Sequence, residues 1–417
     1  MALLNVCFNS SLWLTTITFE FFEISSKILF TANRQEQSAE DQNSEMQFIA
    51  ASENDYDYEF WSDTEIHVRV PDGAASGAVV VNTERGRGVS SAKLSVSYPA
   101  GKKTYDNRRT YVVQVCADIA NKVSPSDSSI TLYIPRPPLS SLQPVANLSD
   151  YYPEPLIKDD LKDIIHQKAF NKILNNNERF SQNFVISTYS VESNIKGQSI
   201  KPYYDTKRLL YSAYTSPDAC IPSGSTEVNS LRQVITGRER NPYNQAKLIY
   251  DYMIEHYKLE KKLRNGNASP LDLIAKKKGD AYDFAIIFTA LCRNAGIPSI
   301  PIGGILVEEN SVSRSHWWTE LYFENYGWFA VDVALGAGLE FKPFSPVNDA
   351  REYYFGNMDC QHVAFSRGWN QIRPSLINSK TVYRPRTYAL QSIWEESGDD
   401  TSSYSSLWND PVVIGIY

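Results

Sequence analysis

The chain has 417 residues, with 41 Lys and Arg against 48 Asp and Glu, so its formal net charge is −7. This length accommodates two or three domains with a sizeable buried core. A mildly acidic chain without a basic run and interleaved aromatics excludes the usual nucleic-acid-binding proteins.

The cysteines and histidines are sparse and scattered. The five cysteines show no CxxC spacing, so we expect neither a disulfide framework nor a zinc or redox motif. The five histidines do not cluster along the chain at metal-ligand spacing, so we expect no metal and no cofactor. These residues are Cys7, Cys116, Cys220, Cys292 and Cys360, with His67, His166, His256, His316 and His362.

Residues 1–57 are predicted to be a lead segment followed by a linker. The apolar stretch 12–22 is interrupted by charges and lacks a basic start, so it is no confident membrane span. We favour a degenerate secretion signal over an amphipathic lead segment, which predicts an extracytoplasmic location with a cytoplasmic one as the alternative. Membrane association is expected only if this segment is an anchor. The polar composition of residues 33–57 is typical of a solvated linker.

Residues 58–138 alternate apolar and polar side chains between Gly, Asp, Asn and Ser clusters, which predicts an antiparallel β-sandwich-like domain. We favour a packing or spacer role for it over ligand binding. Residues 139–235 are predicted to be a mixed, β-rich connecting region. Within it, Leu156–Leu174 is interpreted as a helix and Phe184–Val191 as a strand.

A core domain is predicted over residues 236–345. Asn241 is a natural helix cap and Pro242 a natural first-turn residue. Apolar residues then recur on one helical face, and Gly266–Pro270 breaks the chain before a short helical stretch. We interpret the basic run Lys276–Lys278 as a solvated surface near a helix start. The apolar face consists of Ala246, Ile249, Tyr250, Met253, Ile254 and Tyr257.

The stretch from Lys278 to Asp332 carries the functional argument. Three- and four-residue apolar spacing predicts a buried helix that begins near Asp280 or Ala281 and ends at Gly296. Three strands are expected to follow, the last two joined by a turn at Asn325–Gly327. This hairpin brings His316 within a residue or two of the position opposite Asp332.

This stretch resembles the core of the transglutaminase-like superfamily, which has a papain-like fold. The similarity rests on a helix motif, a His motif and an Asp motif in the family's order. It implies an α+β fold with a helix bundle packed on an antiparallel sheet, and a Cys-His-Asp triad with His316 and Asp332 as base and orienting carboxylate. The matching residues are Gly279, Asp283, Phe284, Ala285, Leu291, Arg293, Ala295, Gly296, Ile297, Pro298, His316, Trp317, Trp318, Glu320, Gly327, Trp328 and Asp332.

The chain departs from the family at the nucleophile, where Ala281 replaces the catalytic Cys. Cys292 lies on the same predicted helix but about 16 Å further along its axis. It also sits among apolar residues, where a thiol stays protonated. We therefore interpret Cys292 as a core residue. Loss of a triad nucleophile typically costs about 10⁶ in turnover.

Residues 346–417 are predicted to be a C-terminal capping extension. Its short strands or loops are expected at Tyr353–Phe365 and Thr381–Leu390. We interpret His362 as structural. The acidic and Ser-rich segment Glu395–Ser406 is interpreted as a surface loop.

Three functional hypotheses follow from these residues. The favoured one is an inactive transglutaminase-like protein that serves as a peptide or glycan-peptide binding module or as a structural module. The second is a cysteine peptidase, amidase or transglutaminase in which Ala281 is an engineered or atypical replacement. The third is a hydrolase in which His316 activates water, for which the sequence shows no oxyanion hole.

Overall fold

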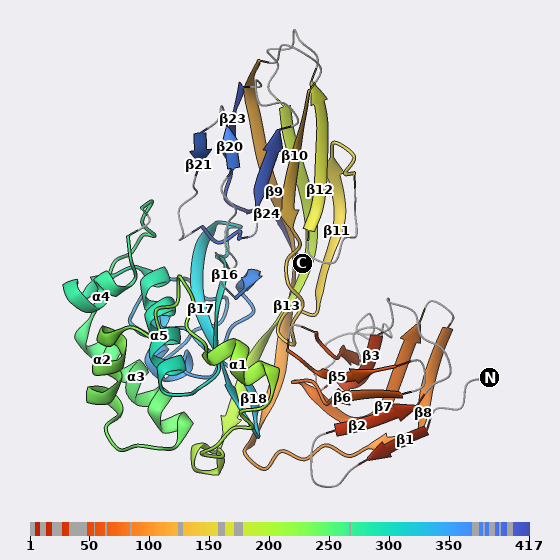
Figure 1. The fold of residues 1–417 in the computed structure, drawn as a ribbon, viewed down its shortest axis with the longest axis vertical. Helices are drawn as coiled ribbons and strands as arrows, with labels where there is room; N and C mark the ends of the chain where they lie inside the picture. Colours follow the sequence, from red (N-terminus) through yellow and green to blue (C-terminus); the bar gives the residue numbers. More distant parts are fainter. Residues whose placement is uncertain are drawn as a thin grey trace.

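The computed structural model describes most of the chain, and Figure 1 shows its path. The described residues are 5–8, 14–18, 27–32, 48–53, 55–62, 65–83, 86–123, 128–156, 163–170, 178–266, 268–368, 375–377, 380–382, 388–391, 393–397 and 403–417.

The helical part of the core surrounds one buried helix, α5 (Ala281–Asn294). Every residue from Ala281 to Arg293 is buried, as expected for a helix that is covered on all sides. It lies with α2 (Thr226–Thr236), α3 (Pro242–His256) and α4 (Leu271–Lys276) at the left of Figure 1. The shorter helices are α1 (Leu209–Thr215), α6 (Val333–Gly336) and α7 (Ala350–Tyr353).

The predicted starts of α3 and α5 agree with the structure. Asn241 caps α3 by accepting hydrogen bonds from the backbone of Tyr243 and Asn244, and Pro242 is the first helical residue. Asp280 caps α5 in the same way. These helices were predictable because their caps and apolar faces are local signals.

The core sheet is antiparallel and has four strands in the order β18-β17-β16-β19. Its strands are β16 (Ser299–Val307), β17 (Ser313–Phe323), β18 (Gly327–Val331) and β19 (His362–Arg367). The predicted turn joins β17 to β18, with Gly327 at a φ of +94°. The ladder pairs Thr319 with Val331, so Asp332 directly follows the last paired residue of β18.

Two further sheets stand above the core in Figure 1. One contains β11, β13, β9, β23 and β24; the other contains β12, β10 and β22. Buried residues of β9 and β13 pack in one cluster with Ile305 of β16 and Val363 of β19. The bounds are β9 (Gly101–Val123), β10 (Ser128–Pro135), β11 (Val145–Tyr152), β12 (Asp163–Phe170), β13 (Glu178–Ile195), β22 (Trp394–Ser397), β23 (Ser403–Trp408) and β24 (Val412–Ile416), with a separate hairpin of β20 (Ser375–Ile377) and β21 (Lys380–Val382).

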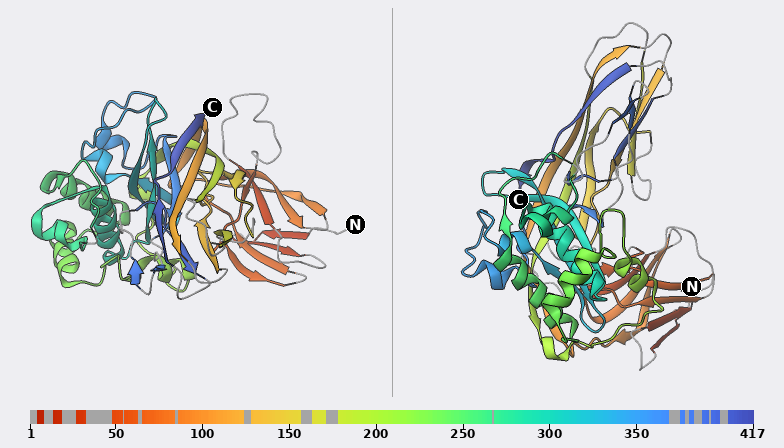
Figure 2. Two further views of the ribbon diagram at one scale, coloured as in Figure 1. Left: turned by 90° about the horizontal axis from the view of Figure 1, so that it is seen from above. Right: turned by 60° about the vertical axis from the view of Figure 1, so that its left-hand side comes forward.

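The N-terminal region consists of two four-stranded sheets, β1-β2-β6-β5 and β4-β3-β7-β8, which share one buried cluster. Figure 2 shows it on the opposite side of the long strands from the helices. Its strands are β1 (Asn5–Phe8), β2 (Leu14–Thr18), β3 (Lys27–Ala32), β4 (Phe48–Ala50), β5 (Tyr58–Trp61), β6 (Glu65–Arg69), β7 (Ala74–Thr83) and β8 (Gly86–Leu94).

The N-terminal interpretation needs correction. Ile28 and Phe30 of β3 are fully buried in the cluster of the N-terminal sheets, so a removable leader that includes them would open this core. Residues 48–57 are not a solvated linker, because Ile49, Ala51 and Asp57 are buried. The rest of the predicted linker, residues 33–47, lies outside the described residues. Strands between residues 58 and 138 also pair with strands outside that range, so they do not form a self-contained sandwich.

Two more predictions were wrong because strand partners lie far away in sequence. The expected helix at Leu156–Leu174 is, over its described residues 163–170, the strand β12, which pairs with β10. The expected loop at Glu395–Ser406 contains parts of β22 and β23, which pair with β10 and β9. Their tertiary pairing outweighs the local helical spacing in one case and the polar composition in the other.

No helix among the described residues has both the length and the apolar composition needed to cross a membrane. The strand Phe184–Val191 predicted within the connecting region is present as part of β13.

Candidate functional site

The start of α5 is built by local hydrogen bonds. The Asp280 carboxylate accepts from the backbone N–H of Asp283 at 3.1 Å, and Asp283 accepts from the backbone N–H of Asp280 at 3.2 Å. This reciprocal pair is a capping box. Gly279 is required here, because a Cβ atom at this position would lie 2.7 Å from the Asp283 carboxylate.

A preceding segment is tied onto this helix start. The strands β14 (Lys258–Leu259) and β15 (Lys278–Gly279) pair in parallel, and the backbone N–H of Arg264 donates to Asp280 at 2.8 Å. The Arg264 guanidinium forms an ion pair with Asp283. Burial nevertheless raises the pKa of Asp283 to about 6, because it outweighs the opposing effect of Arg264.

Ala281 is the first residue of α5, and its side chain is a buried methyl group. It belongs to the same buried cluster as Trp318, Ala334 and Leu335. Trp318 stacks on the ring of His316, and Ala334 and Leu335 follow Asp332 in α6. Residue 281 thus shares a core with the side chains that flank the predicted His and Asp.

The structure brings His316 and Asp332 together, as the predicted hairpin requires. His316 Nε2 lies 2.5 Å from Asp332 Oδ2, and both residues are buried. The other carboxylate oxygen of Asp332 accepts from the backbone N–H of Leu335 at 2.8 Å, which caps α6. With Nε2 engaged by the carboxylate, Nδ1 is the ring nitrogen that remains for a base.

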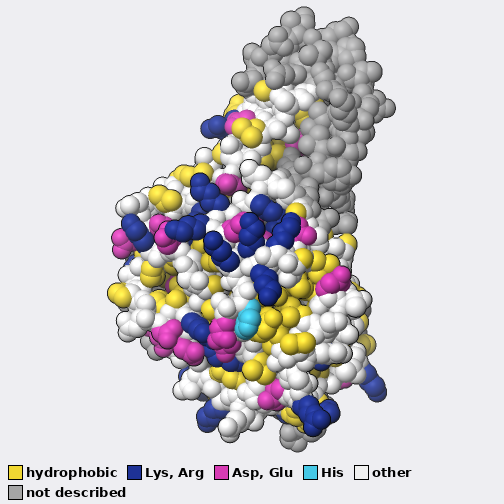
Figure 3. Space-filling view, turned by 90° about the vertical axis from the view of Figure 1, so that its left-hand side faces the viewer, with side chains coloured by type: hydrophobic (Ala, Val, Ile, Leu, Met, Phe, Trp, Pro, Cys, Tyr) yellow, Lys and Arg dark blue, Asp and Glu magenta, His cyan; other side chains and the backbone are white. Residues whose placement is uncertain are grey.

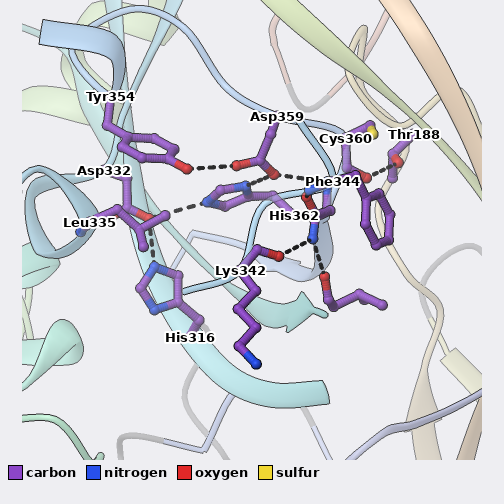
Figure 4. Close-up of polar contacts among 12 residues, drawn as sticks. Thr188, His316, Asp332, Leu335, Lys342, Phe344, Tyr354, Asp359, Cys360 and His362 are labelled. Atoms are coloured by element: carbon purple, nitrogen blue, oxygen red, sulfur yellow. Dashed lines mark hydrogen bonds and ion pairs between the residues drawn. The ribbon is translucent and has the colours of Figure 1, made fainter. Parts of the chain in front are cut away.

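A second histidine, which the sequence analysis interpreted as structural, completes a buried cluster (Figure 4). His362 Nε2 lies 3.2 Å from Asp332 Oδ2, and its Nδ1 lies 2.9 Å from Asp359 Oδ1. The Tyr354 hydroxyl donates to the other Asp359 oxygen at 2.9 Å. A continuous chain of buried polar contacts therefore runs from His316 to Tyr354.

The sheet register explains why the two histidines meet. Gly304 of β16 pairs with His316 on one side and with Ala364 on the other, so β16 separates β17 from β19. A Cβ atom at Gly304 would lie 2.1 Å from the Val363 carbonyl oxygen and 2.8 Å from the Trp318 ring. Gly304 therefore leaves no room for a side chain, and across β16 the His316 and His362 rings lie 6.0 Å apart between centroids.

Electrostatic contacts within the cluster oppose the effect of burial. Burial alone would raise the pKa of Asp332, but His316 and His362 hold it well below its ordinary value. Burial likewise disfavours the charged form of His362, but Asp359 and Asp332 raise its pKa to about 9. Asp332, His316 and His362 offer three potential metal-ligand atoms, all within 4.8 Å of one another.

Two segments contribute residues to the buried cluster that contains Ala281, Leu259 and Leu263 from one segment and Leu339 from the other. An exposed ion pair of 2.7 Å between Lys261 and Glu340 joins the two segments. Ala281 is 5%, His316 1% and Asp332 0% exposed. The predicted triad positions are therefore closed to solvent.

A small cavity adjoins the cluster on another side. Its volume is about 20 Å³, and its lining includes Trp318, Glu320, Asp359, His362 and Arg367. This is room for about one water molecule, since a cavity needs roughly 10–15 Å³ to hold a water. A peptide side chain is too large for it.

The other residues singled out from sequence lie outside the cluster. Cys292 is fully buried on α5, and burial raises the pKa of its thiol, so its interpretation as a core residue is confirmed. The Lys276–Lys278 run is exposed, as predicted, with Lys276 paired to Asp272 and Lys278 to Glu260. The helical face carries many further basic side chains among acidic ones (Figure 3).

His362 and Asp359 were missed because their partners are distant in sequence. The three-residue spacing of Asp359 and His362 was the one available signal, and such spacing is common in surface segments. Only the pairing of β19 with β16 places His362 beside Asp332.

Comparison with known proteins supports the resemblance. Residues 229–333 match the family model described as the transglutaminase-like superfamily. An uncharacterized protein of Haemophilus influenzae is 25% identical over 215 residues, which cover 44% of this chain and 58% of that relative.

Two solved structures are similar at low identity. One is a candidate cysteine protease from Cytophaga hutchinsonii, with 16% identity, 75% of this chain and 93% of that chain covered, and a TM-score of 0.47. The other is the periplasmic domain of TgpA from Pseudomonas aeruginosa, with 12% identity, 57% and 88% covered, and a TM-score of 0.30. The matched span 229–333 includes α5, the strand β17 that carries His316, and Asp332 at the start of α6, so the chain contains a domain of the transglutaminase-like superfamily.

Proposed function

We propose that this protein is a catalytically inactive transglutaminase-like protein in which the core serves as a structural module. The observation that carries this proposal is Ala281 at the first position of α5, in one buried cluster with the residues that flank an intact His316–Asp332 pair. A methyl group cannot attack a carbonyl, and acyl transfer in this family's manner begins with that attack. Loss of a triad nucleophile typically reduces turnover by about 10⁶.

The contacts of the core with its neighbours support the structural role. The sheet strands β16 and β19 pack on the long strands β9 and β13. Arg367 of β19 pairs with Asp55 of the N-terminal region and, at 3.1 Å, with Glu320 of β17. Lys103 of β9 also binds Asp72 of the N-terminal region at 2.6 Å. The core thus ties two β-rich regions together without any use of the triad positions.

The closed site argues against the peptide-binding form of the hypothesis. Ala281 is only 5% exposed, so a peptide or glycan-peptide could reach it only if residues packed around it moved. The cavity beside His362 is too small to receive a side chain. We therefore do not propose a peptide or glycan-peptide ligand. A binding experiment on the intact chain would reveal one.

The first experiment measures amide hydrolysis and γ-carboxamide acyl transfer by the purified chain. We expect rates equal to those of the His316→Ala variant and of buffer. Turnover by the native chain that His316→Ala abolishes would overturn the proposal and favour a hydrolase in which His316 activates water.

The close His316–Asp332 contact favours a second candidate, an acyl-transfer enzyme of the cysteine peptidase, amidase or transglutaminase type whose natural residue 281 is Cys. Sequencing codon 281 in the source gene decides this directly. The Ala281→Cys variant tests whether the rest of the site is competent. We expect a thiol-directed electrophile to label the Ala281→Cys variant. Labelling should be weaker in the double variant that combines Ala281→Cys with His316→Gln. The unmodified chain is the matched control.

An extracytoplasmic location remains part of the proposal. Its support was the apolar N-terminal segment, and the burial of Ile28 and Phe30 weakens that support. Fractionation of cells that produce the full chain, followed by mass determination of its N-terminus, tests the point. Recovery with cytoplasmic markers would favour the alternative.

A further inference from the structure

We propose that His316, Asp332 and His362 form a binding site for a divalent transition-metal ion, with Zn²⁺ as the first candidate. This inference goes beyond the structural role proposed above. It does not depend on residue 281, so either proposal can fail without the other.

The three side chains offer a suitable set of ligand atoms. His316, Asp332 and His362 each offer one ligand atom, these three atoms lie within 4.8 Å of one another, and all three residues are buried. Two histidines and one carboxylate are a ligand set of catalytic zinc sites and of non-haem iron sites. A buried cluster of this composition is selective for such ions over Mg²⁺ and Ca²⁺, which prefer oxygen ligands.

The residues behind the ligands are arranged as in established metal sites. His362 Nδ1 lies 2.9 Å from Asp359 Oδ1, and Asp359 also accepts hydrogen bonds from Tyr354 and the Gln361 backbone. A carboxylate that binds the far nitrogen of a histidine fixes its orientation and leaves Nε2 free as a ligand. Asp332 is held by the Leu335 backbone through Oδ1, which leaves Oδ2 for the ion.

The contacts of the two histidines converge on one oxygen atom. His316 Nε2 and His362 Nε2 lie 2.5 Å and 3.2 Å from Asp332 Oδ2, and Asp359 is a second buried carboxylate in contact with His362. A divalent ion among these atoms would have two nitrogen ligands and one oxygen ligand, and its charge would be opposite to that of the buried carboxylates.

One of the three ligand-atom distances already suits a metal ion; the shortest must lengthen, and the widest, up to 4.8 Å, must shorten. Bonds of about 2.0–2.2 Å in a tetrahedral site place ligand atoms about 3.3 Å apart. His362 Nε2 and Asp332 Oδ2 are already 3.2 Å apart, whereas His316 Nε2 is at 2.5 Å and must move outward by under about 1 Å. The cavity of about 20 Å³ that adjoins His362 has room for a water molecule as fourth ligand.

The experiment uses the full chain without a histidine tag. It is treated with chelator, incubated with one equivalent of Zn²⁺ or Co²⁺, desalted and analysed for bound metal by mass spectrometry. We expect one ion per chain and, for Co²⁺, visible absorption typical of tetrahedral coordination. A folded chain that retains neither ion, nor Fe²⁺ under anaerobic conditions, would overturn the proposal.

Variants identify the ligands. His362→Ala is expected to abolish stoichiometric binding, whereas Asp359→Asn should weaken the Zn²⁺ affinity by about 10–100-fold. His256→Ala is the matched control, because His256 is exposed at the end of α3 and far in sequence from the cluster. Since His362→Ala can fail to fold, Asp359→Asn gives an independent reading. Unchanged affinity in Asp359→Asn, or binding lost in His256→Ala, would contradict the assignment.

Discussion

The start of α5 and the histidine cluster are built in different ways. At the helix start, a capping box of Asp280 and Asp283 and the close approach of Gly279 set the geometry within five consecutive residues. The cluster instead joins His316, Asp332 and His362 from β17, α6 and β19, which meet only because β16 lies between the two histidine strands.

A motif residue can be retained for catalysis or for the structure that it supports. Gly279 and Asp283 belong to the family's nucleophile motif, yet both have structural tasks at the helix start that need no thiol. The His316–Asp332 pair also has a structural reason to persist, because removal of one partner leaves the other buried without it. An intact motif around Ala281 is therefore compatible with an inactive protein.

The largest expected effect lies in the cluster. Asp332→Ala should lower the free energy of unfolding by about 3–5 kcal/mol, because it leaves two buried histidines without their common partner. Urea unfolding with chelator present measures this. Asp349→Ala is the matched control, since Asp349 also caps a four-residue helix but is exposed, and it should cost only about 1 kcal/mol. Equal losses in both variants would mean that Asp332 acts only as a helix cap.

At the helix start, we expect a substitution to have a smaller effect on the free energy of unfolding. Gly279→Ala should lower the free energy of unfolding by about 1–3 kcal/mol, because the new Cβ would lie 2.7 Å from one oxygen of Asp283. Gly266→Ala, in the segment that precedes α4, introduces a Cβ with nothing within 4 Å and should be nearly neutral. If the two variants are equally stable, the close approach at Gly279 is not a constraint.

The helix start should also show its own pH dependence. The pKa of Asp283 rises from 3.8 to about 6 on folding. The folded protein therefore binds this proton more tightly than the unfolded chain, and the associated stability is present below pH 4 and lost as pH rises through 6. The loss is on the order of 2–3 kcal/mol. Unfolding between pH 4 and 6 should show a weaker slope in Asp283→Asn, and identical slopes would refute the assignment.

The smallest expected effect is in the two segments joined by Lys261 and Glu340. Lys261→Ala removes an exposed ion pair with Glu340, so the melting temperature should not change measurably. In the Ala281→Cys background it should instead speed labelling by a thiol-directed electrophile, because the two segments lose their link. A labelling rate that is unaffected would show that Leu259, Leu263 and Leu339 keep the site closed by themselves.

The parts of the site that were predictable from sequence are those with local signals. The bounds of α3 and α5, the β17–β18 hairpin and the burial of Cys292 follow from caps, turn residues and apolar spacing. The strands β12, β22 and β23 were assigned wrongly, because β10 and β9, which pair with them, lie elsewhere in the chain. The apolar spacing of 156–174 and the polar composition of 395–406 carried no information about those partners.

By itself, the sequence determined that a transglutaminase-like helix and hairpin form here and that residue 281 cannot act as a nucleophile, because side-chain identity and short-range periodicity are sufficient for both. Only the tertiary structure decided that His362 joins His316 and Asp332 and that the triad positions are closed. Those features depend on which strands pair across β16 and on which distant segments pack over α5, and no local pattern specifies either.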